Sequence, residues 1–239
     1  MLILGLTGNA GVGKDTVADY LVKAYGFVKF AFSDALYAEV QAAFGLPDQS
    51  LLRDRATKEV PQDKLALENC LDTDFLDMLV RLTGGPAGGE EPISPRQVLQ
   101  WWGTEYRRAQ NPNYWLDKNE DWLAAVQAAF RYAEQAPQHF VNTTCRFENE
   151  REWIQTGAYW GLWRGNVWHI HRQGVDPVVA HASETPLVVL PGEREIYNND
   201  SIERLHRAVD LLMTTQARFV KVMPMAPYEA PMDDVGGAD

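Results

Sequence analysis

The chain has 239 residues, of which 46% are hydrophobic, and it carries a formal net charge of −11. This length allows one large domain or two small ones with a sizeable buried core. The negative charge disfavours a nucleic-acid-binding surface, which is normally basic. The two cysteines form no disulfide framework, the first residues lead straight into a predicted strand, and no apolar run approaches the roughly 20 residues of a membrane helix. We therefore expect a cytoplasmic protein without a secretion signal that binds neither membranes nor nucleic acid.

The most informative stretch is the glycine-rich segment 8–16, which reads GNAGVGKDT. It follows an apolar run at 2–6 that predicts a strand, and it leads into a helical pattern over 15–25. Glycines in this setting let backbone N–H groups turn toward an anion, and the helix adds its positive end. A lysine at this spacing reaches the outer phosphates of a nucleoside triphosphate. The segment therefore predicts an ATP-binding loop, whose binding residues are Gly11, Val12, Gly13, Lys14, Asp15 and Thr16.

The residue after the lysine departs from the commonest form of such loops. Asp15 stands where serine or threonine usually contacts Mg²⁺, and Thr16 follows it. Both side chains carry oxygen atoms, the ligands that Mg²⁺ prefers. We therefore expect Asp15 and Thr16 to hold the Mg²⁺ that accompanies ATP. The alternative, a chance glycine-rich turn before a helix, does not explain the matched spacing.

Strands and helices alternate along most of the chain. Apolar runs predict strands at 2–7, 27–32, 140–144, 165–171 and 195–197, with a short one at 188–189. Periodic patterns and capping residues predict helices at 15–25, from Ser33 to 44, at 65–82 with a break near Asp72, from Ser94 and Pro95 onward, at 119–135, at 149–156 and from Ser201 to 212. A turn is expected at 111–115, and a solvated charged surface at 53–59. The alternation predicts an α/β fold in which helices cover both faces of a parallel sheet and ligands bind at the carboxyl ends of its strands.

The helix that begins at Ser94 has two distinct faces. Its core-facing side is expected to carry Leu99, Trp102 and Tyr106. A second face, spaced i, i+4, i+7 and i+11, carries Arg96, Gln100, Gly103 and Arg107. Exposed helix surface is one interpretation of this second face, and a site for a phosphate and a base is the other, because guanidinium binds phosphate through two parallel bonds. Trp115 follows the helix, where its ring either packs in the core or stacks on a base.

Four blocks of the sequence carry a more specific signal. They are residues 13–16 (GKDT), 94–108 (SPRQVLQWWGTEYRR), 146–150 (RFENE), and 181–184 (HASE) together with 198–201 (NNDS). In these blocks the chain resembles the deoxynucleoside monophosphate kinases of tailed bacteriophages, a branch of the P-loop kinases. The resemblance implies a three-layer P-loop kinase fold over residues 1–220, with a parallel sheet flanked by helices. It also implies a helical substrate-binding region at 46–135 and a lid-like loop at 172–187 that contains His181. The composition of residues 221–239, which are rich in Pro, Met, Asp and Gly, predicts a mobile tail.

The resemblance further implies an activity, namely transfer of the γ-phosphoryl group of ATP to deoxynucleoside 5′-monophosphates for phage DNA synthesis in the host cytoplasm, with Mg²⁺. No general base is required, because the attacking group is already an anionic phosphate oxygen. The residues implied in catalysis are Lys14, Asp15, Arg146 and Arg172. Those implied in binding the monophosphate are Lys29, Arg96, Gln100, Arg107, Arg108 and Trp115. The sequence leaves open which bases are accepted and whether the protein is a homodimer.

Thr144 is the main departure from the family pattern, which usually has an aspartate two residues before the arginine of the third block. A strand-end aspartate normally helps to hold Mg²⁺. The threonine therefore keeps a non-catalytic nucleotide-binding relative as an alternative. A kinase that acts on a modified base within phage DNA is another, which the net charge of −11 disfavours. A dephospho-coenzyme A kinase has a similar loop but gives no reason for the Pro95-Arg96-x-x-x-Gln100 pattern.

Overall fold

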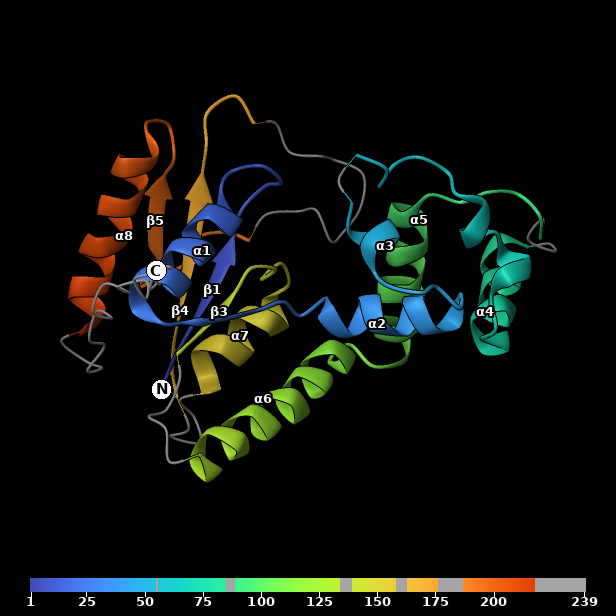
Figure 1. Ribbon diagram of the computed structural model, residues 1–239, viewed down its shortest axis with the longest axis horizontal. Coiled ribbons are helices and arrows are strands. Elements are labelled where there is room, and N and C mark those ends of the chain that lie inside the picture. Colours follow the sequence, from blue (N-terminus) through green and yellow to red (C-terminus); the bar gives the residue numbers. More distant parts are fainter. Residues whose placement is uncertain (55, 85–88, 134–138, 158–162, 176–186, 218–239) are drawn as a thin grey trace, which may run out of the picture.

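The computed structural model describes residues 1–54, 56–84, 89–133, 139–157, 163–175 and 187–217, and Figure 1 shows two parts, a sheet with its helices and a helical region beside it. The strands are β1 (Leu2–Thr7), β2 (Val28–Phe30), β3 (Phe140–Asn142), β4 (Arg164–His171) and β5 (Arg194–Tyr197). The helices are α1 (Lys14–Tyr25), α2 (Asp34–Ala43), α3 (Ser50–Arg53), α4 (Thr73–Thr83), α5 (Pro95–Gln100), α6 (Tyr114–Tyr132), α7 (Glu148–Thr156) and α8 (Ile202–Ala217). Short 3₁₀ turns lie at Asp63–Leu65 (η1) and Leu67–Asn69 (η2), and a π-helix lies at Trp101–Arg108 (η3).

The five strands form one parallel sheet in the order β2-β3-β1-β4-β5. Helices α1 and α8 cover one face, and α7 and α6 cover the other. The α/β prediction is confirmed, and the arrangement is consistent with a P-loop kinase fold. The loops that follow β1, β3 and β4 consequently meet at one edge of the sheet, as expected for a ligand site.

The central strand β1 shows why these layers form. All six of its residues are buried, because both faces of the strand are covered. Leu2, Leu4 and Leu6 pack with α1 and α8, whereas Ile3 belongs to the cluster on the opposite face. Gly5 lets α7 approach closely, since a Cβ there would lie 2.5 Å from Cδ1 of Ile154.

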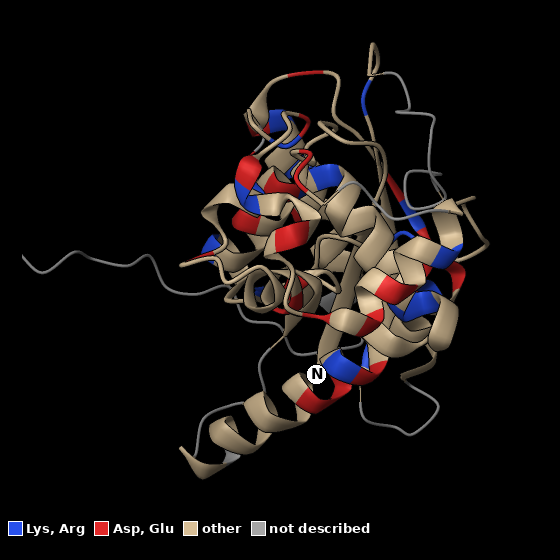
Figure 2. Cartoon of the chain, turned by 90° about the vertical axis from the view of Figure 1, so that its right-hand side faces the viewer, with Lys and Arg blue, Asp and Glu red and all other residues tan. Residues whose placement is uncertain are grey.

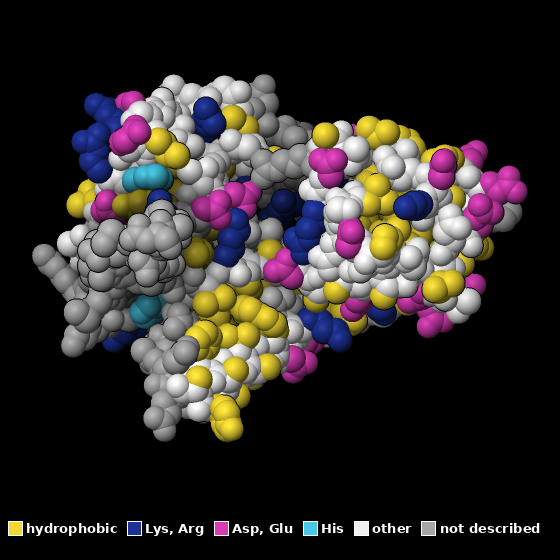
Figure 3. Space-filling view, in the orientation of Figure 1, with side chains coloured by type: hydrophobic (Ala, Val, Ile, Leu, Met, Phe, Trp, Pro, Cys, Tyr) yellow, Lys and Arg dark blue, Asp and Glu magenta, His cyan; other side chains and the backbone are white. Residues whose placement is uncertain are grey.

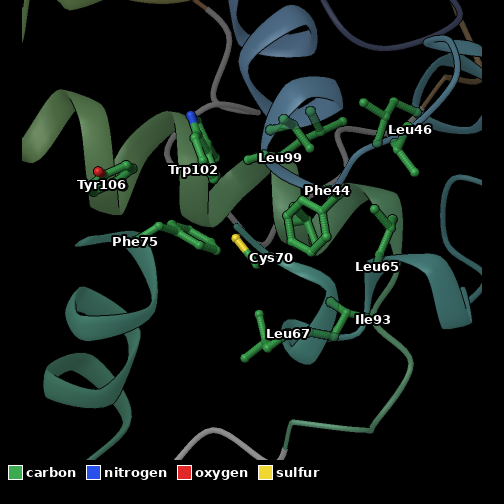
Figure 4. Packing of buried hydrophobic residues seen from close by; sticks show 14 of the residues in the cluster. Phe44, Leu46, Leu65, Leu67, Cys70, Phe75, Ile93, Leu99, Trp102 and Tyr106 are labelled. Atoms are coloured by element: carbon green, nitrogen blue, oxygen red, sulfur yellow. The ribbon is translucent and has the colours of Figure 1, made fainter. Parts of the chain in front are cut away.

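The helical region has a hydrophobic core of its own, built from α2 to α5, η3 and the turns between them. Figure 4 shows Phe75 and Trp102 directed toward each other, and their ring centroids are 4.6 Å apart. Leu99, Trp102 and Tyr106 are all buried, which confirms the predicted core face of the helix that begins at residue 94. The cap is also confirmed, because Oγ of Ser94 accepts a hydrogen bond from the backbone N–H of Gln97 at 3.3 Å.

Several predicted elements differ in the structure. The helix expected at 65–82 is replaced by η1, η2 and α4, and Asp72, where a break was expected, caps α4 by accepting from the N–H of Phe75. Ser33 makes no capping side-chain bond to α2; instead, Asp34 accepts from the N–H of Ala31 at 2.8 Å. Residues 188–189 form no strand.

The expected turn is present at residues 112–113, but helix α6 already begins at Tyr114, so the helix start predicted at 119 is wrong. Asparagine often caps the start of a helix, but Asn119 is buried inside α6, where its Nδ2 donates to the carbonyl oxygen of Trp115. Most of the predicted lid, including His181, and the predicted tail lie outside the described residues. Within the described part, no helix combines the length and the apolar character that crossing a bilayer requires.

Candidate active site

The glycine-rich segment forms a loop between β1 and α1 whose backbone favours glycine at several positions. The backbone φ angles are 131° at Gly8, 79° at Gly11 and 107° at Gly13, all in the region that other residues rarely adopt. A Cβ at Gly8 would lie 2.3 Å from the carbonyl oxygen of Ile170, and one at Gly13 would lie 2.4 Å from Nδ2 of Asn198. The loop is therefore held tightly against the end of β4 and the segment that follows β5.

The start of α1 is suited to an anion. Gly13, the N-cap residue, makes no capping side-chain bond, so the positive end of the helix is not occupied by its own cap. The Nζ atom of Lys14 donates to the carbonyl oxygens of Gly8 and Asn9, both at 2.7 Å, which keeps the ammonium group over the loop. Val12 is not among the residues that line the cleft beside this loop; its side chain is buried, and its carbonyl oxygen accepts from Nδ2 of Asn198 at 2.8 Å.

A cleft of about 660 Å³ opens beside this loop, between the sheet and the helical region. From the loop and α1 it is lined by Ala10, Gly11, Gly13, Lys14, Asp15 and Thr16; from the ends of the strands by Ala31, Ser33, Thr143, Thr144, Arg146, Arg172 and Asn198; and from the helical region by Tyr37, Arg53, Lys58, Glu59 and Arg96. Figure 3 shows Lys and Arg side chains gathered where the two parts meet. The structure thus brings the predicted loop residues together with three of the predicted arginines.

A smaller pocket of about 140 Å³ adjoins the cleft on the side of the helical region. Its apolar walls come from Phe32, Leu36, Tyr37, Leu99, Trp115 and Phe147, and its polar groups include Gln100, Thr104, Arg108 and Glu150. The residues that line both spaces are Ser33, Tyr37, Lys58, Arg96, Thr144 and Arg146. We call the larger space the loop cleft and the smaller one the aromatic pocket. Lys58, Arg96 and Arg146 supply three cations at their junction, where Arg96 forms an ion pair with Glu59.

The two neighbouring arginines 107 and 108 have different positions. Arg108 lines the aromatic pocket, where its guanidinium lies 3.9 Å from the centre of the Phe147 ring and donates to Oε1 of Glu150 at 2.5 Å. Arg107 is not among the residues that line either space; its Nε donates to Glu39 at 2.8 Å. The cause is the π-helix η3, whose wider turns break the 3.6-residue spacing from which the position of Arg107 was extrapolated.

Trp115 and Glu150 form fixed parts of the pocket wall. Trp115 is buried and its Nε1 donates to the carbonyl oxygen of Gly103 at 3.1 Å, so this ring both packs in the core and lines the pocket. Glu150 is also buried, and it accepts from the backbone N–H groups of Arg146 at 2.7 Å and Phe147 at 3.2 Å. Burial raises the pKa of Glu150, an effect that Arg108 and these N–H groups oppose. The carboxyl group fixes the segment that carries Arg146.

Thr144 has a structural contact at the position where an aspartate was expected. Its Oγ1 accepts from the backbone N–H of Phe32 at 3.0 Å, and its own N–H donates to Oδ1 of Asn142 at 2.9 Å. The hydroxyl therefore ties the ends of β2 and β3 together while it lines both spaces.

Asp15, which is predicted to bind Mg²⁺, lies at the loop cleft. It lines the loop cleft beside Thr16, so the two offer a carboxylate and a hydroxyl oxygen there. Asp15 also forms an ion pair with Lys29 at 3.1 Å, and Lys29 contacts Asp19 at 3.0 Å. Lys29 lines neither space. Over the described ranges, no three His, Cys, Asp or Glu residues cluster as a metal site.

Sequence reasoning missed several residues of the site. Tyr37 and Lys58 line both spaces. Lys58 belongs to residues 53–59, which were expected to form a solvated surface. The backbone N–H of Arg96 donates to the carbonyl oxygen of Lys58 at 3.0 Å, which brings this irregular segment against α5. Only the mixture of charges at 53–59 could have pointed to it. Asn198 was part of a noted block, but its support of the glycine loop was not foreseen.

Comparison with curated proteins finds a likeness to a viral protein. No family model matches the chain. The chain is 26% identical over 215 residues to a protein of Acanthamoeba polyphaga mimivirus that is named "Putative deoxynucleotide monophosphate kinase". The aligned region covers 87% of this chain and 94% of the viral protein.

Proposed function

We propose that the protein transfers the γ-phosphoryl group of ATP to a deoxynucleoside 5′-monophosphate, as a P-loop kinase. The observation that carries this proposal is the junction of the two spaces, where Lys58, Arg96 and Arg146 line both the loop cleft and the aromatic pocket. A kinase for nucleotides must bring two polyanions together, and such a cluster of cations lowers their repulsion. The similarity to the viral protein supports the same activity.

At the ATP end, the backbone of the glycine loop and the first turn of α1 bind the phosphates, with Gly11, Gly13 and Thr16 at the cleft. Lys14 neutralises charge on the β- and γ-phosphates. Asp15 and Thr16 are the residues that hold Mg²⁺, directly or through water. When bound, Mg²⁺ neutralises phosphate charge and orients the γ-phosphoryl group.

At the other end, the base lies in the aromatic pocket against Trp115, with Gln100 and Arg108 at its polar edge. Arg96 and Lys58 bind its 5′-phosphate. An oxygen of that phosphate attacks the γ-phosphorus, the bond from this phosphorus to the β–γ bridging oxygen breaks, and ADP and a nucleoside diphosphate form. Arg146 and Arg172, which both line the loop cleft, neutralise the group in transfer.

We infer that the diphosphates supply DNA synthesis in cells infected by a phage, as the resemblance to phage kinases implies. Action on a base within DNA is the weaker alternative, because the net charge is −11 and Figure 2 shows acidic and basic residues interspersed over the face of the helical region turned to the viewer. A non-catalytic role is the other alternative, and the structural contact of Thr144 is the feature that favours it.

The test is an assay of the purified chain with ATP, Mg²⁺ and each common or modified deoxynucleoside 5′-monophosphate. Chromatography should show ADP and a nucleoside diphosphate forming in equal amounts. ATP binding without any diphosphate would contradict the proposal and favour a non-catalytic protein. Transfer of labelled phosphate to duplex DNA, with binding that weakens steeply as salt rises, would favour the kinase of modified DNA bases instead.

A further inference from the structure

We propose that Tyr37 selects 2′-deoxyribose over ribose by forming a fixed wall of the sugar site. This inference rests on the proposed function, because it requires a nucleoside 5′-monophosphate whose base lies in the aromatic pocket and whose phosphate lies at the cations. No sequence signal pointed to Tyr37. It follows from the position that α2 gives this residue between the two spaces.

The sugar of such a nucleotide has to lie where the loop cleft and the aromatic pocket meet, because base and 5′-phosphate are attached to opposite ends of it. Six residues line both spaces. Lys58, Arg96 and Arg146 are charged and suit the phosphate. Of the remaining three, Ser33 and Thr144 are small, so Tyr37 supplies the large uncharged surface at this position.

The ring of Tyr37 is held from several directions. Its backbone N–H donates to the carbonyl oxygen of Ser33 at 3.1 Å in the first turn of α2. Its hydroxyl oxygen accepts from Nζ of Lys58 at 3.2 Å. The guanidinium of Arg53 lies over the ring, with its central carbon 4.1 Å from the ring centre. The two side-chain contacts come from α3 and from the segment after it, so the ring cannot swing aside without breaking them.

Arg53 is itself anchored, which makes this clamp firm. Its Nη2 lies 2.8 Å from Oδ1 of Asp34, and its Nε donates to Oε1 of Gln49 at 2.9 Å. A cation over an aromatic face is attracted by the electrons of the ring. Arg53 and Lys58 thus fix the face and the hydroxyl end of one side chain.

A fixed aromatic wall distinguishes the two sugars by chemistry as well as by size. The 2′-methylene of deoxyribose is apolar and packs against ring carbons. The 2′-hydroxyl of ribose would lose its hydrogen bonds to water there, and the ring face offers no equivalent acceptor. Rejection of one added hydroxyl by an apolar surface is typically limited to about 10²-fold. We therefore expect the parent protein to prefer deoxynucleotides by about 10- to 100-fold.

The experiment measures both binding and turnover for matched pairs of deoxyribo- and ribonucleoside 5′-monophosphates. The first readout is the ratio of dissociation constants by calorimetry without ATP, and the second is the ratio of kcat/KM. Tyr37→Ala should reduce both ratios about tenfold, mainly because ribonucleotides improve. Tyr37→Phe keeps the wall and should keep most of the preference. Arg53→Ala, which releases the clamp but keeps the ring, should give an intermediate ratio.

Tyr20→Ala is the matched control, because it removes a tyrosine ring from α1 that contacts Asp210 and His206 and lines neither space. Its deoxy-to-ribo ratio should equal that of the parent. Equal affinity of the parent for both sugars, or an unchanged ratio in both Tyr37→Ala and Arg53→Ala, would overturn the role of Tyr37. Selective binding without phosphoryl transfer would overturn the proposed kinase activity and leave the sugar selection standing.

Discussion

The two ends of the candidate site are built from different materials. The end proposed to bind ATP is made mainly by backbone, in a loop whose glycines have φ angles that side chains disfavour. The end proposed to bind the monophosphate is made by side chains from segments far apart in the sequence, including Tyr37, Lys58, Arg96 and Arg146. Most side-chain substitutions therefore remove few binding groups from the backbone-built end. Substitutions at the side-chain-built end can change which ligand is bound.

This difference has a consequence for how each end fails. A site built from backbone loses its function when the loop changes conformation or when the charge of Lys14 is removed. A site built from side chains loses one contact with each substitution. Each loss should lower the affinity for the monophosphate more than the affinity for ATP. The following predictions test this division, from the largest expected effect to the smallest.

Lys14→Ala should reduce kcat by about 10²–10³-fold while the protein remains folded, because it removes a charge that stabilises the transferring group. Steady-state kinetics and circular dichroism measure the two effects. Lys23→Ala, in the last turn of α1, is a control that should have little effect. A Lys14→Ala enzyme as fast as the parent would contradict the phosphate-loop assignment.

Arg96→Ala should raise the KM of the monophosphate by about 10- to 100-fold with little change for ATP, since a hydrogen bond to a charged group is worth about 1.5–3 kcal/mol. Arg204→Ala, on the exposed surface of α8 and paired with Asp200, is a matched control for loss of an arginine. If the KM of ATP alone rose, the role of α5 in binding the monophosphate would be wrong.

Gly13→Ala should lower the affinity for ATP about tenfold. Alanine in a left-handed conformation costs about 1–2 kcal/mol, and the added Cβ would displace Asn198. Gly45→Ala is the control, since Gly45 also has a positive φ of 58° but has no atom within 4 Å of an added Cβ. Both variants should lose stability in thermal unfolding, and only Gly13→Ala should lose ATP affinity. Equal ATP affinity in the two would show that the close approach of Asn198 is not needed.

Asp15→Asn should raise the Mg²⁺ concentration required for half-maximal activity a few-fold and lower kcat, because a neutral amide is a poorer ligand for this cation. Adding Thr144→Asp should partly restore both, since a carboxylate oxygen can also accept the hydrogen bond from Phe32. Asp19→Asn removes a second carboxylate that contacts Lys29 but does not line the cleft, so it should leave the Mg²⁺ requirement unchanged. An Asp15→Asn enzyme with the parental Mg²⁺ requirement would exclude Asp15 from the metal site.

The same division explains what the sequence could predict. The strand, glycine loop and helix at the start of the chain are contiguous, so local spacing was sufficient to predict them. Arg96, Gln100 and Gly103 line the site as expected, because regular helical spacing connects the first two and only a short step leads to the third. The extrapolation failed at Arg107, where the π-helix changes the number of residues per turn.

Other parts of the site depend on contacts that no local pattern contains. Lys58 reaches the junction because its segment pairs with the start of α5, and Tyr37 lines the site because Arg53 and Lys58 meet it from elsewhere. Asn119 was misjudged for a related reason, since an amide that suits a helix start is here buried and bonded within the helix. Tertiary contacts overrode the local preference in each case.

The strand order also bears on how the chain folds. Strand β1 is made first, but Ile3 pairs with Phe140 on one side and Gly165 on the other, so its partners come much later in the chain. The core of the helical region, by contrast, is drawn from residues 35–115 alone. Contacts between distant residues form slowly because a long loop has to close. We expect the helical region to collapse first during synthesis and the glycine loop to acquire its shape only after β4 has joined β1, so that nucleotide binding marks the last stage of folding.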